Sequence, residues 1–154
     1  MKRIEGHLTA KTNFRFAMVI SRFNHFISER LFDGCLDGFR RHGIGEDQLT
    51  AVWVPGSWEI PVTVKRLAQS GEYAAIVCLG AVIRGSTGHY DHIAGEASKG
   101  MAQVALETGV PIVNAVLTTD NIEQAIERAG TKMGNKGFEA ASTALEMANL
   151  LEAL

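Results

Sequence analysis

The chain has 154 residues, of which 46% are hydrophobic, 21% are charged and 3 are proline. This composition is typical of one globular domain, and it excludes a disordered tail, a collagen-like chain and a disulfide-stabilised mini-protein. With 15 Lys and Arg against 17 Asp and Glu the formal charge is −2, so the chain lacks the basic surface expected of a nucleic-acid or anionic-lipid binder.

The cysteines and the first residues indicate a compartment. Cys35 and Cys78 both fall in apolar segments and form no C-x-x-C pair, which favours buried, reduced thiols. No apolar stretch follows Met1-Lys2-Arg3, and no run approaches the roughly 18 apolar residues that cross a bilayer. We therefore expect one domain, residues 1–154, in the cytoplasm, with no membrane partner.

Four short apolar runs, taken in chain order, predict β-strands, and a segment with helical spacing follows each of them. The predicted strands are residues 16–20, 49–54, 74–79 and 111–117. The runs are nearly continuous in apolar residues, which is typical of parallel strands covered on both faces. The predicted helices are centred on residues 27–39, 61–68, 93–105, 122–129 and 136–151. Gly43 is predicted to end the first of these helices, and Asp120 with Glu123 has the spacing of a capping box.

Alternation of strands and helices predicts right-handed crossovers and an α/β fold. We expect a flavodoxin-like three-layer sandwich, with a four-stranded parallel sheet and helices on both faces. Ile4, Gly6 and Leu8 alternate with polar residues ahead of these units. They predict an extra N-terminal edge strand that pairs with a neighbouring subunit, because it has no partner in its own chain.

Ligands of such sheets bind outside the carboxyl ends of the strands. The third strand leads into Gly85, Ser86, Thr87 and Gly88 directly before a long helix. Free amides, hydroxyls and the positive helix end together predict an anion site, most simply for phosphate. The segment lacks the Walker and G-x-S-x-G patterns.

His89 begins that helix and is a candidate to exchange protons near neutral pH, although a surface or capping role is the alternative. With Asp91 and His92 it hints at a metal, but no further ligand has a recognisable spacing, so no metal is expected.

The first two strands are followed by aromatic residues beside polar ones. Phe23 and Asn24 could hold a planar heterocycle, or Asn24 could simply cap the next helix. Trp58 could stack on a ring and Glu59 could accept hydrogen bonds from hydroxyls, or both could belong to an ordinary Pro-Gly turn with an acidic helix start.

Three polar residues lie on or after the fourth strand. Asn114 falls within the strand, Arg128 on the short helix and Lys136 in the connector after it. Arg suits a phosphate and Lys a polar substrate chain, whereas solvated surface charges are the plainer interpretation.

Taken together, these stretches resemble the lumazine synthase family (6,7-dimethyl-8-ribityllumazine synthases) over essentially the whole chain. The strongest segments of the resemblance are residues 22–24, 52–61, 80–91 and 118–130. The resemblance implies condensation of 5-amino-6-(D-ribitylamino)uracil with 3,4-dihydroxy-2-butanone 4-phosphate in riboflavin biosynthesis, with release of phosphate and water and without metal or organic cofactor.

The resemblance also implies a role for each matching residue. His89 would be the catalytic proton shuttle. The pyrimidine and its ribityl chain would contact Phe23, Asn24, Ser57, Trp58, Glu59, Ala81, Val82, Ile83, Asn114 and Lys136. The phosphate would contact Gly85, Ser86, Thr87 and Arg128.

Family sites are shared between neighbouring subunits of a pentamer, to which Arg128 and Lys136 would come from the adjacent chain. The connector from Gly130 to Gly137 is short, which favours a 60-subunit icosahedral shell over a free pentamer or decamer. Asn114 stands where many relatives have Phe, so one wall of the pyrimidine site would differ in this chain.

Two alternatives use the same fold. A flavin- or lumazine-binding carrier would keep the aromatic surfaces and the anion site and bind tightly without turnover. A riboflavin synthase of the type that shares this fold would need lumazine as its only substrate.

Overall fold

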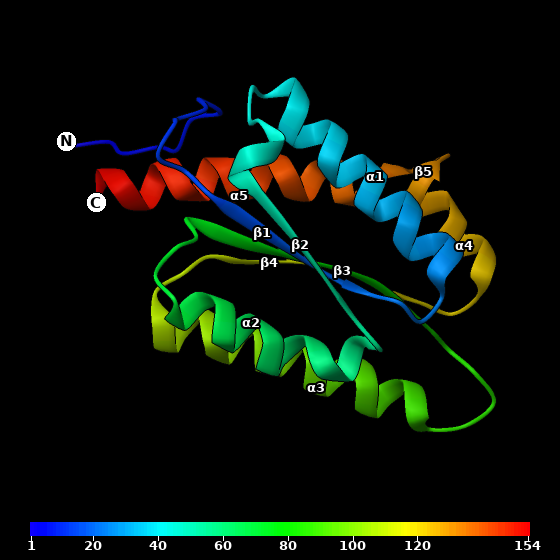
Figure 1. Ribbon diagram of the computed structural model, residues 1–154. Helices are drawn as coiled ribbons and strands as arrows, with labels where there is room; N and C mark the ends of the chain where they lie inside the picture. Colours follow the sequence, from blue (N-terminus) through cyan, green and yellow to red (C-terminus); the bar gives the residue numbers. More distant parts are fainter.

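The computed structural model describes residues 1–154 and contains a four-stranded parallel sheet between two layers of helices (Figure 1). The strands are β1 (Phe16–Ser21), β2 (Leu49–Val54), β3 (Ala75–Ile83) and β4 (Ile112–Thr119), in the order β2-β1-β3-β4. The predicted fold class is therefore confirmed. Both outer strands, β2 and β4, have an edge without a partner in the chain.

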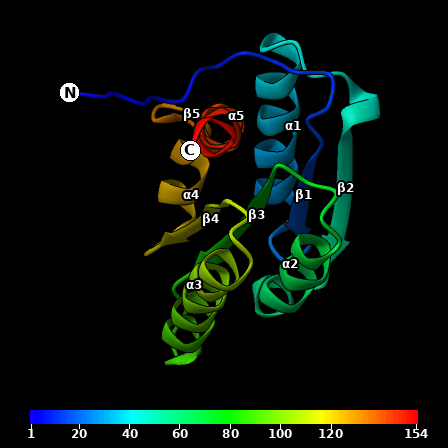
Figure 2. The ribbon, with the colours of Figure 1, turned by 90° about the vertical axis from the view of Figure 1, so that its left-hand side faces the viewer.

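Helices cover both faces of the sheet, as Figure 2 shows. One layer holds α1 (His25–Arg41), α4 (Ile122–Arg128) and α5 (Lys136–Ala153), and the other holds α2 (Ile60–Gln69) and α3 (His89–Thr108). Short 3₁₀ turns at Glu46–Gln48 and Ser57–Glu59 precede β2 and α2. A small hairpin of β5 (Ala129–Thr131) and β6 (Gly134–Asn135), which the sequence did not predict, joins α4 to α5.

Two strand ends differ from the sequence prediction. β3 runs on to Ile83, so Ala81 and Val82 belong to the sheet and not to the following loop. They pair with Leu117 and Thr118 of β4, which is itself longer than predicted. The apolar, partly β-branched residues after Gly80 continue the ladder to β4, although the ladder to β1 ends at Leu79. A glycine inside a strand does not end it while a neighbouring strand goes on.

Two helix ends test the capping predictions. Gly43 ends α1 with φ +84, and its amide donates to the Arg40 carbonyl while the next amide, of Ile44, donates to Phe39. This is a Schellman motif and confirms the predicted stop. The N-cap of α4 is Asn121 and not Asp120: the Asn121 side chain accepts from the Gln124 amide at 2.9 Å.

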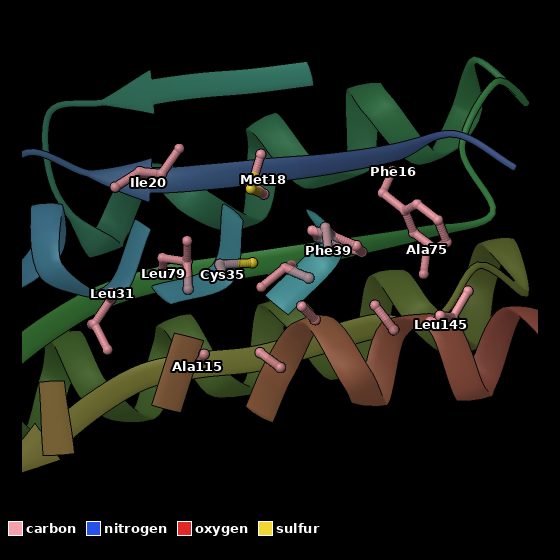
Figure 3. Packing of buried hydrophobic residues seen from close by; sticks show 14 of the residues in the cluster. Phe16, Met18, Ile20, Leu31, Cys35, Phe39, Ala75, Leu79, Ala115 and Leu145 are labelled. Atoms are coloured by element: carbon pink, nitrogen blue, oxygen red, sulfur yellow. The ribbon is translucent and has the colours of Figure 1, made fainter. Parts of the chain in front are cut away.

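The core is divided by the sheet into two apolar clusters. Phe16, Met18 and Ile20 of β1 point toward α1 and α5, where Cys35 packs among them (Figure 3). The alternate side chains of β1 pack with Cys78 against α2 and α3. Both cysteines are buried and unpaired, and burial raises the pKa of both thiols, which keeps them protonated and unreactive.

Residues 1–11 form no strand within the chain, and the part from Gly6 to Lys11 contacts α5. The Asn149 side chain donates to the carbonyls of His7 and Thr9 at 2.9 and 3.0 Å. Gly6 packs so closely that a Cβ there would lie 2.3 Å from the Glu146 carbonyl oxygen. The segment is thus held in place without a ladder partner, and its pairing with a neighbouring subunit stays a prediction.

Asn135 joins three elements through one side chain. Its Oδ1 accepts from the amides of Gly137 and Phe138 at the start of α5, and its Nδ2 donates to the carbonyls of Arg30 and Ala129. We expect Asn135→Ala to lower the free energy of unfolding by about 2–3 kcal/mol, since a cap and partly buried hydrogen bonds are lost together. Denaturant unfolding measures this loss.

The matched control is Asn121→Ala, because Asn121 caps α4 through a single hydrogen bond. We expect that variant to lose about 1 kcal/mol. Equal losses in the two variants would mean that the contacts of Asn135 outside α5 contribute nothing.

Candidate active site

A cavity of about 770 Å³ opens at the carboxyl ends of the central strands. It is bounded by the ends of β1 and β3, the turn before α2 and the first two turns of α3. Most of the predicted site residues meet there. They are Phe23, Asn24, Ser57, Trp58, Glu59, Ala81, Val82, Ile83, Gly85, Thr87 and His89.

Asn24 connects the ends of β1 and β3. It is the only non-glycine residue in the left-handed region, with φ 59, a conformation that Asn tolerates better than most residues. Its side chain does not cap α1, although its backbone holds the N-cap position. Instead Nδ2 donates to the Ala81 carbonyl at 2.8 Å. The capping alternative is therefore wrong for the side chain, whose amide oxygen is left to accept a further hydrogen bond.

Two substitutions separate the backbone role of Asn24 from its amide. We expect Asn24→Ala to lose about 2 kcal/mol of stability, because it places a Cβ in the left-handed region and breaks the bond to Ala81. Asn24→Gly accepts that backbone and should lose about 1 kcal/mol less. Both variants should raise the Michaelis constant for a planar substrate several-fold. Normal binding of that substrate by Asn24→Gly would show that the amide is not a ligand.

Two aromatic side chains that line the cavity are exposed to solvent. Phe23 is 71% exposed and Trp58 is 54% exposed, although side chains of this size usually bury most of their area. Glu59 lines the same cavity from the turn that also carries Trp58. These residues offer two flat apolar faces and a hydrogen-bond acceptor to a ring with a polar substituent.

Close packing under the cavity favours glycine at position 80. A Cβ on Gly80 would lie 3.0 Å from the Cβ of Ser21 and 3.3 Å from the Oγ of Ser57. Ser57 is nearly buried and lines the cavity from the turn before α2. Gly80 therefore lets that turn pack against the ends of β1 and β3.

The start of α3 has the free amides and the helix end that favour binding of an anion. Gly88 occupies the N-cap position without a side-chain cap, and His89 donates its own amide to Thr87 Oγ1 at 3.4 Å. The other amides of the first turn have no helical partner and carry the positive end of a 20-residue helix. Because Thr87 accepts with its oxygen, its hydroxyl proton is free to donate to an anion. The His89 ring lines the cavity at the same point.

Several predicted residues lie elsewhere. Asn114 and Lys136 line a second cavity of about 480 Å³ between β4, α5 and the end of α3. Asn114 Oδ1 accepts from the Val116 amide, and Lys136 pairs with Glu139. Asn114 precedes the end of β4 by five residues, which is roughly 16 Å along the strand. Within one chain these two side chains therefore do not join the first cavity.

Ser86 and Arg128 also lie outside the lining of the first cavity. Ser86 is exposed in the loop that swings out from the end of β3 (Figure 1). Arg128 is half-buried on α4 and donates to the Gln124 carbonyl at 3.0 Å.

Comparison with known families shows to which family the chain belongs. A sequence model described as 6,7-dimethyl-8-ribityllumazine synthase matches residues 13–152. The chain belongs to the 6,7-dimethyl-8-ribityllumazine synthase family. It is accordingly a transferase that forms 6,7-dimethyl-8-ribityllumazine in riboflavin biosynthesis, and it acts on small molecules.

Some residues that line the first cavity were not predicted from the sequence. They are Gly56, Tyr90, His92, Ile93 and Glu96. The last three follow His89 at i+3, i+4 and i+7, the spacing of one helix face, so helical periodicity counted from His89 could have found them.

Two whole-chain features complete the description. No group of three or more His, Cys, Asp or Glu side chains is placed to hold a metal ion. None of the helices has both the length and the apolar character needed to cross a lipid bilayer.

Proposed function

We propose that the first cavity condenses 5-amino-6-(D-ribitylamino)uracil with 3,4-dihydroxy-2-butanone 4-phosphate, releasing phosphate and water. The observation that carries this proposal is the meeting, in one cavity, of exposed aromatic rings, an anion site and a histidine. The aromatic rings suit a pyrimidine, and the anion site suits a phosphate ester. The histidine suits the proton transfers of their reaction.

The aromatic end of the cavity is assigned to the pyrimidine. Phe23 and Trp58 flank its faces, and Asn24 and Ser57 bond its polar edge. The backbone of Ala81, Val82 and Ile83 forms the floor. Glu59 accepts hydrogen bonds from the ribityl hydroxyls, with Lys136 of a neighbouring subunit at the far end of that chain.

The start of α3 is assigned to the phosphate. Gly85, Ser86 and Thr87 supply amides and hydroxyls, and Arg128 of a neighbouring subunit supplies a guanidinium. An anion at a helix N-terminus is favoured by the macrodipole, and a planar guanidinium adds paired hydrogen bonds to two of its oxygens.

His89 is assigned the proton transfers. The amine of the pyrimidine adds to the ketone and water leaves as an imine forms. A carbon-bound proton is then removed while the C–O bond to phosphate breaks, which leaves an enol. The enol takes up a proton at carbon and becomes a ketone, and the second nitrogen adds to this carbonyl and closes the ring with loss of water. His89 lies beside the leaving phosphate, where one imidazole can accept the first proton and return it later. Both reactants are intrinsically reactive, so positioning contributes much of the rate.

We also propose that the site is completed by assembly into pentamers. The separation of Asn114 and Lys136 from the first cavity supports this, since a neighbour's second cavity facing the first would unite the two sets. Residues 1–11, which lack a ladder partner, would pair with an open sheet edge of the adjacent subunit.

Twelve such pentamers would form a 60-subunit shell, because the connector from α4 to α5 is only the short β5–β6 hairpin. Light scattering tests this, and a pentamer or decamer in solution would contradict it. We further expect one domain, residues 1–154, in the cytoplasm, where the buried thiols Cys35 and Cys78 stay reduced.

The direct test mixes the purified protein with both substrates and follows lumazine absorbance. A rate above the uncatalysed one supports the proposal. Tight binding of riboflavin without turnover would instead identify a carrier, and conversion of lumazine supplied alone would identify a riboflavin synthase.

A further inference from the structure

Arg84 lies at the junction of three elements beside the proposed phosphate site. It directly follows β3, and its amide donates to the Thr119 carbonyl at 2.8 Å, extending the ladder to β4 by one bond. Its Nε donates to Asp120 Oδ1 at 3.2 Å, and its Nη1 lies 3.5 Å from Asp91 Oδ1. Its guanidinium carbon stands 4.3 Å from the centre of the Tyr90 ring. One side chain thus links the end of β3, the first turn of α3 and the turn before α4.

The loop that Arg84 begins has few other attachments. A Cβ on Gly85 or on Gly88 would meet no atom within 4 Å. The one side-chain hydrogen bond inside the loop is the 3.4 Å contact between Thr87 and the amide of His89. The contacts of Arg84 therefore hold the two ends of the loop together, whereas the loop itself is free to change shape.

Arg84 is not placed to bind the phosphate directly. Its side chain does not line the cavity, although both Ile83 and Gly85 do. Its donors face Asp91 and Asp120, and the hydrogen bond to Asp120 raises the pKa of the guanidinium. Two carboxylates around one guanidinium leave a net negative charge, which would repel a phosphate at that point.

We propose that Arg84 is a positioning residue that holds the Gly85–Gly88 loop in the shape that binds phosphate. The inference rests on the phosphate site proposed above. Each contact of Arg84 is solvent-exposed and individually weak. The contacts with Asp91, Asp120 and Tyr90 act together on a loop with almost no other support. Without them the loop would have to become ordered when phosphate binds, and the entropy lost in that step lowers the affinity for the anion.

The test measures binding of inorganic phosphate by calorimetry, and the Michaelis constant of the phosphate-bearing substrate. We expect Arg84→Gln to weaken both about tenfold, with kcat changed less than threefold and no effect on the pyrimidine substrate. Arg84→Lys keeps the charge but not the planar fork, so it should recover part of the loss. Arg41→Gln, which removes a similar exposed ion pair with Asp37 at 2.8 Å, is the matched control and should change nothing.

Asp120→Asn distinguishes positioning from charge. Removing a negative charge near an anion site would tighten phosphate binding if Arg84 acted only by neutralising carboxylates. Positioning predicts the opposite: Asp120→Asn should weaken phosphate binding about as much as Arg84→Gln does. The variant that combines Asp120→Asn with Arg84→Gln should bind phosphate no more weakly than either single variant. Tighter phosphate binding by Asp120→Asn would overturn the proposal, and this variant also carries the test if Arg84→Gln does not fold.

Thr87→Ala separates failure of this inference from failure of the phosphate assignment. If Thr87→Ala weakens phosphate binding and Arg84→Gln does not, Arg84 has no positioning role and the phosphate site stands. If neither substitution changes binding, the phosphate lies elsewhere and both proposals fall. Light scattering on each variant confirms that assembly matches the unaltered protein.

Discussion

Replacing His89 with alanine is expected to lower kcat about 10²-fold, the usual contribution of one general acid–base group. The Michaelis constants should change little, because the proposed site holds the phosphate through amides and hydroxyls of the preceding loop and the pyrimidine through aromatic side chains. The residual rate should still exceed the uncatalysed one, since two bound, reactive substrates remain aligned. Steady-state kinetics with both substrates measure this.

The matched control is His25→Ala, which removes an exposed histidine that pairs with Glu29 outside the cavity. It should leave kcat unchanged. Full activity of His89→Ala would remove the imidazole from the mechanism and leave positioning as the source of catalysis. A raised Michaelis constant with normal kcat would make His89 a phosphate ligand instead.

Mixing two impaired chains should restore activity if neighbouring subunits share each site. Arg128→Ala is expected to raise the Michaelis constant of the phosphate-bearing substrate about 10- to 100-fold, the loss of a charge-assisted pair. In assemblies co-expressed at equal amounts with His89→Ala, about a quarter of the sites join an intact His89 to an intact Arg128 of the neighbour. At low substrate the mixture should therefore reach about a quarter of normal activity, far above either parent.

Mixed assemblies of His89→Ala with Asn24→Ala supply the control. Both residues line the same cavity of one chain, so their losses should not complement each other. If the His89 and Arg128 variants also fail to complement, Arg128 acts within its own subunit and the shared-site proposal is wrong.

The sheet could be predicted from the sequence because its central strands, β1 and β3, are buried on both faces and all four apolar runs are nearly continuous. The same property hid the end of β3: nothing in Ala81-Val82-Ile83 distinguishes a strand from a buried loop until the ladder to β4 is seen. The N-cap of α4 was misplaced by one residue, since Asp120 and Asn121 are both good caps and local spacing does not choose between them.

The cavity could be predicted because each of its walls follows a strand in the chain. Glu96 was missed because it lies at the end of the second turn of α3, whereas the prediction concerned only the start of that helix. Only its place on the same helix face as His89 reveals it. Asn114 and Lys136 could not be assigned from spacing, because their distance from the cavity depends on which strand lies at the sheet edge. Only the resemblance gave them a role.

The division of the core by the sheet gives each helical layer its own natural probe. Cys35 lies in the layer of α1 and α5, and Cys78 in the layer of α2 and α3, each fully shielded from water. A thiol reagent can modify either one only when its layer opens. The rates of alkylation at Cys35 and Cys78 would thus compare how often the two helical layers open, without any introduced label.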